Sequence, residues 1–267
     1  MFLSNFLIKT TISSYKSFIW DSKSKNLKGV KDFRSIDIEL LIGIERQKKT
    51  ILNNTINFAK GNFTNNALLW GSRGNGKSTL IKSIFCEINK DYNNLKLLQL
   101  NKNDIFDISI VYEKFRAFNN YRFIIFIDDL SFEKIDSDYK IIKSTLDGSI
   151  QNQPNNILLY VTSNRRHLMP REMIENERSS AIHTDESVEE KISLSDRFGL
   201  WIGFHNLSQN DYLEIVQKYC TEFNLSFNES IKKQSIQWSL QRGNRTGRTA
   251  WQFILNHASN ENKKIKF

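Results

Sequence analysis

The sequence predicts an α/β fold in which helices cover both faces of a five-stranded parallel sheet and a small helical domain follows. The first observation is a set of short apolar runs that alternate with helical stretches, at residues 66–70, 95–100, 123–128, 157–162 and 200–204. Such continuous runs are typical of parallel strands that are buried on both faces. The second observation is a glycine-rich loop directly after the first run. The third is purely helical periodicity after residue 206.

The expected helices show apolar residues at intervals of three and four, at about residues 44–59, 77–90, 208–223, 229–242 and 250–258. Ser208 and Asp211 stand at the spacing of a capping box, which predicts where the first helix of the small domain begins. Gly243 is typical of the residue that ends a helix, and it follows the second one. The chain therefore divides into an N-terminal arm (1–36), an α/β core (37–206) and a helical lid (207–267).

Composition excludes several classes of protein. The chain has 267 residues, of which 39% are hydrophobic and 25% charged, so it can bury a core and is not globally disordered. No apolar run approaches the roughly 20 residues of a membrane helix, and the first 20 residues lack the compact apolar stretch of a secretory signal. An organelle transit peptide is a minor alternative. Two cysteines in apolar helical stripes predict buried thiols, so we expect a cytoplasmic protein without membrane contact.

Positive charge gathers at both ends of the chain. The net charge is +9, and residues 1–36 carry seven basic and two acidic groups. Residues 231–267 carry eight basic groups and one acidic group. Such ends are either solvated surface or contacts for an acidic partner, and nucleic acid is a candidate. Because residues 1–36 are polar with scattered aromatic rings, we expect an extended or partly ordered arm.

The loop Gly71-Ser72-Arg73-Gly74-Asn75-Gly76-Lys77-Ser78 matches the pattern G-x-x-x-x-G-K-[ST]. Its glycines let backbone N–H groups converge on phosphate oxygens, and the helix that begins near Lys77 adds its positive end. Lys77 is expected to reach the β- and γ-phosphates, and Ser78 to hold Mg²⁺. A chance glycine-rich turn is the alternative, which the flanking strand and helix disfavour. The predicted nucleotide-binding residues are Gly71, Gly74, Asn75, Gly76, Lys77, Ser78 and Thr79.

The buried run FIIFID delivers Asp128 to the end of a strand, where its carboxylate can hold Mg²⁺ through water. An ordinary turn aspartate is the alternative, which the phosphate loop upstream makes weaker. Asp129 follows at the position where a nucleotide hydrolase with such a phosphate loop would be expected to carry a glutamate. Residues 101–104 read NKND, which resembles a guanine-reading motif. They precede the strand that ends in Asp128 instead of following it, so we interpret them as a helix entry and expect ATP.

Together, GSRGNGKST, FIIFIDD, YVTSN, SLSDRFG and GNRTGRTAW resemble the AAA+ ATPases. The sequence is most similar to an uncharacterised bacterial AAA+ ATP-binding family allied to helicase loaders and initiators. That family has similar segments at LLWG, DDLSFE, TSNRRHLMP and EEKISLSDRFG. The resemblance covers roughly residues 37–257 and implies a P-loop three-layer core with a helical lid.

The resemblance also implies roles for polar residues outside the loop. Asn164 matches the sensor-1 position, where an amide orients the attacking water, although an asparagine that ends a strand is often a turn residue. Arg197 resembles the arginine finger that AAA+ proteins insert into a neighbouring subunit's site. Arg165 and Arg166 are alternatives for that role or for partner contacts.

In the lid, Arg248 matches the sensor-2 arginine, and Arg245 is the alternative. Leu41-Ile42-Gly43-Ile44 matches the segment that packs against adenine, although it also fits a plain helix entry. Glu133 lies four residues after Asp129, and a surface acid is its simpler interpretation.

These residues predict a Mg²⁺-dependent ATPase that remodels or loads a protein partner. Asp129, Asn164 and Arg197 are the expected catalytic residues, and a homo-oligomer would form because Arg197 acts in a neighbouring site. The alternative is an ATP-dependent binding switch with little hydrolysis, which could also contact nucleic acid. A structural nucleic-acid binder and a small-molecule kinase are weaker alternatives. Residues 165–196 form a long connection that we expect to carry partner contacts.

Overall fold

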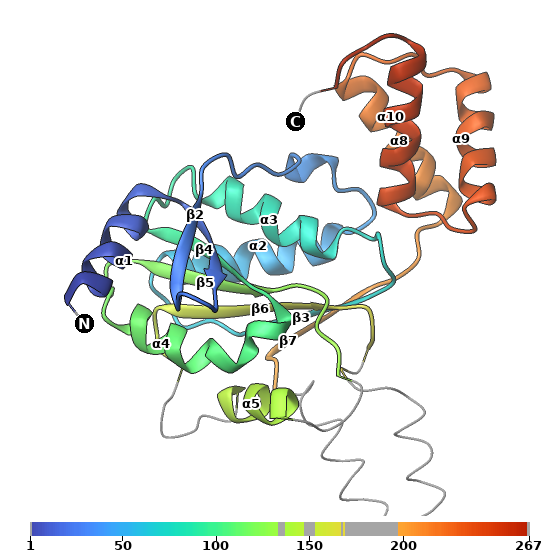
Figure 1. Cartoon of the computed structure of the whole chain (residues 1–267). Helices are drawn as coiled ribbons and strands as arrows, with labels where there is room; N and C mark the ends of the chain where they lie inside the picture. The colour runs from blue at the N-terminus through green and yellow to red at the C-terminus, as the bar shows by residue number, and fades with distance from the viewer. Residues whose placement is uncertain (1, 133–136, 147–152, 167, 169–196, 266–267) are drawn as a thin grey trace, which may run out of the picture.

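In the computed structural model, the described residues are 2–132, 137–146, 153–166, 168 and 197–265. They form an α/β core and a helical lid that projects from one end of it (Figure 1). The sheet has the strand order β2-β1-β4-β5-β6-β3-β7. No helix among these residues is both long and apolar enough to cross a bilayer.

The five predicted strands are confirmed and form the parallel part of the sheet. They are β3 (Ala67–Gly71), β4 (Leu95–Leu100), β5 (Arg122–Ile127), β6 (Ile157–Ser163) and β7 (Leu200–Phe204). Every residue of β6 is buried, as is all of β5 after its first residue. Because the strands are parallel, the loops that follow β3, β5 and β6 all lie at the same edge of the sheet.

The sheet has seven strands, so the expected number of five is wrong. The N-terminal region, which we expected to be extended or partly ordered, forms the helix α1 (Phe2–Ser14) and a hairpin of β1 (Ser17–Asp21) and β2 (Asn26–Val30). Strand β1 pairs in parallel with β4, and β2 pairs with β1 in antiparallel fashion. Because these residues are basic and polar overall, and strand β1 turns only two aromatic rings inward, their composition did not predict a strand.

Burial and one carboxylate explain why the hairpin joins the sheet. Phe18 and Trp20 are 1% and 2% exposed. The indole Nε1 of Trp20 donates a hydrogen bond of 2.8 Å to the buried carboxylate of Asp107. The Lys25 ammonium lies 2.6 Å from the other oxygen of that carboxylate. The hairpin is thus held by apolar burial and by a paired, buried charge.

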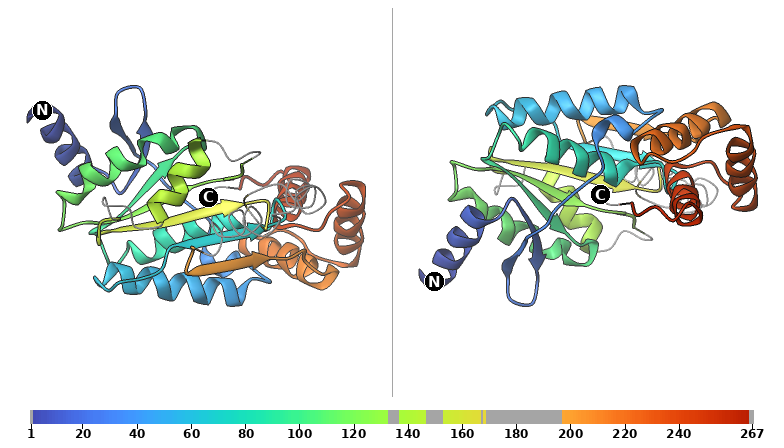
Figure 2. Two further views of the ribbon diagram at one scale, coloured as in Figure 1. Left: turned by 90° about the horizontal axis from the view of Figure 1, so that it is seen from below. Right: turned by 90° about the horizontal axis from the view of Figure 1, so that it is seen from above.

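Helices cover both faces of the sheet (Figure 2). On one face, α2 (Glu45–Ala59) and α3 (Lys77–Ile88) pack against one buried cluster. The other face carries α4 (Ile108–Arg116) and α5 (Ser137–Leu146), together with α1. Two short 3₁₀ helices are η1 (Ile38–Leu40) and η2 (Lys102–Asp107). Residues 101–104 therefore lead into a helix after β4, as the sequence predicts.

The lid has its own hydrophobic core. It consists of α8 (Gln209–Glu222), α9 (Glu229–Gln241) and α10 (Gly247–Asn260). The predicted capping box is present, because the Ser208 side chain accepts from the Asp211 N–H and the Asp211 carboxylate accepts from the Ser208 N–H. Leu40, from η1, is also part of the lid core, so the segment before α2 joins the two units.

Candidate nucleotide site

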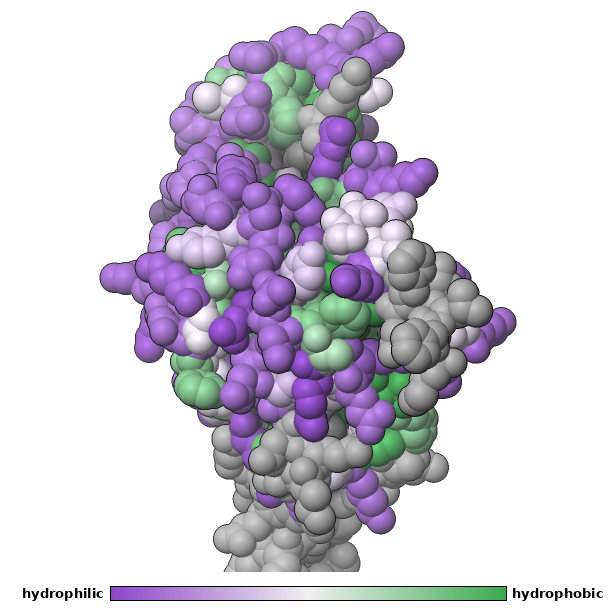
Figure 3. Space-filling model, turned by 90° about the vertical axis from the view of Figure 1, so that its left-hand side faces the viewer, coloured by the Kyte–Doolittle hydropathy of each residue, from purple (hydrophilic) through white to green (hydrophobic). Residues whose placement is uncertain are grey.

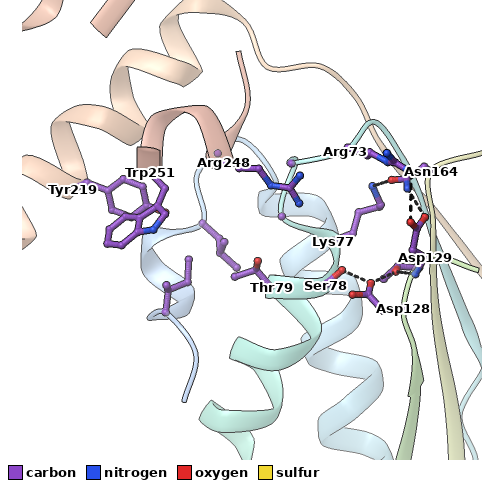
Figure 4. Close-up of a pocket in the computed structure, with 16 residues that line it drawn as sticks. Arg73, Lys77, Ser78, Thr79, Asp128, Asp129, Asn164, Tyr219, Arg248 and Trp251 are labelled. Carbon is purple, nitrogen blue, oxygen red and sulfur yellow. Dashed lines mark hydrogen bonds and ion pairs between the residues drawn. The ribbon is translucent and has the colours of Figure 1, made fainter. Parts of the chain in front are cut away.

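A cavity of about 600 Å³ lies where the carboxyl edge of the sheet meets the lid. Its walls come from the loop after β3, the ends of β5 and β6, the segment before α2, and helices α8 and α10 (Figure 4). One end of the cavity is polar and charged, and the other is apolar and aromatic. This size and arrangement suit a ligand with a charged group and a flat apolar group.

The phosphate loop (residues 71–78) has the backbone that its glycines predict. Gly71, Gly74 and Gly76 have φ values of +136°, +83° and +86°. A side chain at Gly71 would also collide with the carbonyl group of Phe204 on β7. Helix α3 begins directly after Gly76. The N–H groups of its first turn therefore face the cavity edge with the positive end of the helix dipole.

Lys77 lies beneath the loop and is only 7% exposed. Its ammonium donates to the carbonyl groups of Gly71 at 2.7 Å and Ser72 at 2.8 Å, and to Asn164 Oδ1 at 3.3 Å. Burial lowers the pKa of Lys77 to about 8, against the opposing effect of the nearby carboxylates Asp129 and Asp128. A buried cation among these groups is well placed to meet an anion.

Two predicted magnesium ligands from separate motifs lie in contact. The Ser78 hydroxyl donates a hydrogen bond of 2.5 Å to Asp128 Oδ1. Thr162 Oγ1 donates to the same carboxylate oxygen, also at 2.5 Å. A carboxylate beside a hydroxyl is an oxygen donor set of the kind that Mg²⁺ prefers, so these residues fit that ion. Thr162 was not identified from the sequence, although it stands two residues before Asn164 on the same side of β6.

Asp129 and Asn164 also lie together. The Asn164 amide nitrogen donates to Asp129 Oδ1, and the other carboxylate oxygen is 3.6 Å from the Arg73 guanidinium. Asp129 has φ of +54°, a sparsely populated conformation for a residue other than glycine. A hydrogen bond of 3.0 Å from its N–H to Thr162 Oγ1 holds this backbone. Arg73 is a second residue that sequence reasoning missed, since its position in the loop pattern is unrestricted.

The apolar end of the cavity combines the core with the lid. Leu41 lines it, as we expected for the adenine-contacting segment, and Ile36 lies beside it. Tyr219 from α8 and Trp251 from α10 complete this end, with their ring centroids 5.6 Å apart. We interpreted these two aromatic residues only as part of helical stripes. Their place in the cavity depends on how the lid sits on the core.

Of the two candidate arginines in the lid, Arg248 lines the cavity (Figure 4). Its N–H also donates to the Gly74 carbonyl at 3.2 Å, which ties α10 to the phosphate loop. Arg245 instead donates to Gln209 within the lid at 3.2 Å. The geometry thus favours Arg248 for a contact with phosphate.

Of the other predicted residues of the loop, one lines the cavity and one holds the loop in place. Thr79 lines the cavity. Asn75 is 5% exposed and donates to the His205 carbonyl at 2.9 Å, so its side chain fastens the loop to the end of β7.

Arg197 lies at the amino-terminal end of the parallel strands, opposite the end that carries the phosphate loop. It precedes Leu200, the first residue of β7, which pairs with Ala67 at the start of β3. A strand of five residues is roughly 16 Å long, so β7 separates Arg197 from the phosphate loop. Arg165 donates to the Phe132 carbonyl at 3.1 Å. Arg166 lies over the ring of Trp201, which is on β7.

None of Arg165, Arg166 and Arg197 lines the cavity of its own chain. Glu133 and residues 169–196, for which we expected a surface acid and partner contacts, lie outside the described residues.

The family model described as protein of unknown function (DUF815) matches residues 13–261. No curated protein matches the sequence. Among solved structures, domain III of the Thermotoga maritima replication initiation protein DnaA aligns with a TM-score of 0.55 and 14% identity. That alignment covers 86% of this chain and 91% of the DnaA domain.

Two further structures have the same fold. A mutant of T. maritima RuvB aligns with a TM-score of 0.53 and 18% identity, over 88% of this chain and 69% of RuvB. A chain of the E. coli MS115-1 HORMA:CdnC:Trip13 complex aligns with a TM-score of 0.53 and 10% identity, over 82% of this chain and 90% of that chain. These three structures share the α/β fold of this chain, which is the fold that the resemblance to the AAA+ ATPases implied.

Proposed function

This chain belongs to the DUF815 family, and from its AAA+ fold and the cavity we propose that it is a Mg²⁺-dependent ATPase. Its hydrolysis would drive the remodelling or loading of a protein partner. One observation carries the proposal. Two motifs that are 50 residues apart place Ser78 against Asp128, directly beside the Asp129–Asn164 pair.

Binding follows from the two ends of the cavity. The triphosphate lies against the N–H groups of the phosphate loop, with Lys77 below it and Arg248 above it. The adenine lies between Leu41 and the aromatic residues Tyr219 and Trp251. Ser78 and Asp128 would hold Mg²⁺, which would neutralise charge on the phosphates. Because the lid supplies one wall of the cavity, bound ATP holds the lid against the core.

Hydrolysis requires an oriented water molecule. Asp129 accepts a proton or a hydrogen bond from this water, and the Asn164 amide fixes its position. Aspartate is shorter than the expected glutamate by one carbon–carbon bond, roughly 1.5 Å. A misplacement of about 1 Å can cost on the order of 10²-fold in rate. Asp129 therefore works at reduced efficiency unless its unusual backbone moves the carboxylate towards the water.

The arginine finger is the larger determinant of rate. Such a residue is worth about 10³–10⁵-fold in related P-loop enzymes. Arg197 lies across the sheet from its own cavity, so only a neighbouring copy can bring it to the phosphates. Head-to-tail contacts that repeat this arrangement generate a closed ring or an open helical filament, depending on the rotation between subunits. We therefore propose a homo-oligomer in which each site is completed by the next subunit.

Mixing two inactive variants tests this assignment. Asp129→Asn should bind ATP but lose turnover, and Arg197→Ala should lose the stimulation that rises with protein concentration. In a mixture, some sites receive Asp129 from one chain and Arg197 from the other, so part of the activity should return. Undiminished turnover in Asp129→Asn would remove Asp129 from the mechanism. Failure of the mixture to regain activity, with both variants still oligomeric, would remove the trans role of Arg197.

A specific observation supports the alternative function, a binding switch with little hydrolysis. Arg73 and Asn164 both engage the Asp129 carboxylate, which leaves it less able to accept from water. In a switch, ATP binding alone would change the affinity of the lid for a partner. ATP turnover measured with and without candidate protein partners separates the two functions. Arg73→Ala should raise turnover if the ion pair restrains Asp129.

A further inference from the structure

A second cavity of about 510 Å³ lies at the other end of α3. The open end of the β1–β2 hairpin, the segment 31–35 and the last turn of α3 form its walls. It shares no lining residue with the nucleotide cavity. Helix α3 has 12 residues and is therefore roughly 18 Å long, which separates the two cavities. The face of the molecule that carries α1 and the hairpin is largely hydrophilic (Figure 3).

The second cavity is positively charged. Lys16, Lys31 and Arg34 line it, and no acidic residue is among its lining residues. The hairpin register ends at the pair of Ser17 and Val30, and Lys16 and Lys31 flank this last pair at the open end of the hairpin. Both lysines line the same cavity, so their charges repel each other and a bound anion would reduce that repulsion.

Ion pairing distinguishes Lys16 and Lys31 from Lys25 and Lys28 of the same hairpin. Lys25 is paired with Asp107 at 2.6 Å, and Lys28 with Asp21 at 3.0 Å. Among the residues that the structure describes, no carboxylate forms an ion pair with Lys16 or Lys31. Lys16 and Lys31 therefore bring positive charge to the cavity that no ion pair within the described part of the chain balances.

Two buried polar side chains at the same cavity each have an oxygen atom without a hydrogen-bond partner among the described residues. Ser17 and Asn89 line it, and each is 2% exposed. Within the described structure, Ser17 Oγ and Asn89 Oδ1 form no hydrogen bond. The Asn89 amide nitrogen already donates to the Leu95 carbonyl at 2.8 Å. The unpartnered Asn89 oxygen can only accept, so a matching ligand must bring a donor as well as negative charge.

Aromatic rings form the remaining wall. Tyr15, Phe33 and Phe85 line the cavity, and the rings of Phe33 and Phe85 meet edge to face with centroids 5.7 Å apart. Phe85 is 1% exposed and supports this wall from the core, whereas Tyr15 and Phe33 are partly exposed. A planar group can lie against the partly exposed rings, and base stacking on aromatic side chains contributes strongly to the binding of single strands.

We propose that this second cavity binds a nucleotide, with its phosphate between Lys16, Lys31 and Arg34 and its base against the aromatic wall. A nucleotide combines negative charge, hydroxyl, amino or ring N–H donors for Asn89, and a planar ring. An acidic peptide brings charge and N–H donors, but its carboxylate side chains offer no planar ring. The bound nucleotide is either free or part of a single-stranded nucleic acid, since both present the same chemistry.

Binding of a labelled oligonucleotide to the full chain tests the proposal. The probe is a fluorescein-labelled oligothymidylate of about twelve nucleotides, followed by anisotropy in a Lys77→Ala background, which removes the phosphate-binding cation of the first cavity so that no free nucleotide has to be added. The double variant Lys16→Gln/Lys31→Gln should weaken binding by about tenfold or more. Its salt dependence should fall by roughly 1.4 in slope, since each phosphate contact to a single strand contributes about 0.7.

The control removes the same charge from the same region. Lys9 and Lys23 lie on α1 and at the hairpin turn, and neither lines the cavity. Lys9→Gln/Lys23→Gln should retain the affinity within about twofold and keep the salt slope. Ser17→Ala changes no charge and should weaken binding roughly 2- to 10-fold, as expected for one lost hydrogen bond. Equal losses in the two double variants, or no binding by the parent chain, would overturn the proposal.

Competition and chemical protection complete the test. Displacement by thymidine monophosphate indicates a site for free nucleotides, and binding of the oligomer alone indicates a site for strands; either supports the proposal. Displacement by polyglutamate with equal efficiency would overturn it in favour of an acidic peptide.

Cys86 lines the cavity, whereas Cys220 is buried in the lid. Bound oligomer should slow alkylation of Cys86 relative to Cys220, and an unchanged rate would contradict the assigned place.

Discussion

Replacement of Thr162 by valine should uncouple nucleotide binding from hydrolysis. Thr162 is 1% exposed at the end of β6, and its hydroxyl contacts both aspartates of the site. It donates to Asp128 Oδ1 at 2.5 Å and accepts from the Asp129 N–H at 3.0 Å. Valine keeps the shape of the side chain and its branching at Cβ, so the loss is confined to the hydroxyl group.

The magnitude follows from these two hydrogen bonds. A bond to a charged group contributes roughly 1.5–3 kcal/mol, and a typical neutral bond about 0.5–1.5 kcal/mol. Asp128 is only partly buried and keeps its bond from Ser78, so water compensates for part of the loss. We therefore expect the free energy of unfolding to fall by roughly 1–3 kcal/mol.

Turnover should fall more than stability alone would explain. The bond to Thr162 holds the positive φ of Asp129, and without it the backbone is free to relax. A shift of the carboxylate by about 1 Å would lower turnover by on the order of 10²-fold. ATP affinity should change little, because the phosphate loop and Lys77 are untouched.

Thr55 provides a matched control for this substitution. It is 0% exposed, its Oγ1 donates to the Ile51 carbonyl at 2.7 Å, and it shares a hydrogen bond of 2.8 Å with the Tyr160 hydroxyl. Thr55→Val should lower stability by a similar amount and leave turnover nearly unchanged. Urea unfolding and ATP hydrolysis under assembled conditions measure both quantities. Parent-like turnover in Thr162→Val, or an equal loss of turnover in Thr55→Val, would refute the reasoning.

Three further outcomes are expected. Burial lowers the pKa of Lys77 to about 8, and Lys77 should bind phosphate best while it is protonated. ATP affinity should therefore fall by about tenfold per pH unit above about pH 8. Calorimetric titrations at several pH values measure this change. Trp251→Ala should weaken ATP by a stacking contribution of roughly 1–3 kcal/mol but leave inorganic tripolyphosphate unaffected in a competition assay. Asp107→Asn should lose the ion pair with Lys25 and weaken the bond from Trp20, lowering the free energy of unfolding in urea by roughly 1–3 kcal/mol with unchanged ATP affinity.

The parts of the fold that the sequence predicts well are those with strong local signals. The five core strands are continuous apolar runs, and the glycines at 71, 74 and 76 have positive φ in the phosphate loop. The hairpin of β1 and β2 lacks such a signal. Its stability depends on Trp20 and Asp107, which are 87 residues apart and whose pairing no local pattern announces.

The candidate site divides in the same way. Lys77, Ser78 and Asp128 follow from motifs, because each needs a fixed place relative to a glycine or a strand end. Thr162 and Trp251 occupy the cavity because separate segments meet there. A threonine in a buried strand and a tryptophan in a helical stripe are both ordinary core residues by pattern. Only the tertiary arrangement distinguishes them from residues that merely fill the interior.

The arrangement across the sheet bears on the choice between enzyme and switch. Asp129 faces the cavity on a strained backbone, engaged by Arg73 and Asn164, while Arg197 lies at the far edge. Under the proposed mechanism, a single chain therefore combines a restrained acid with a missing cation, and each feature alone would slow hydrolysis. In the proposed oligomer, contact with a neighbour would supply the cation, and a bound triphosphate would offer Arg73 a more highly charged partner than Asp129. Both changes act in the same direction, so turnover should rise steeply with assembly and remain low in the isolated subunit.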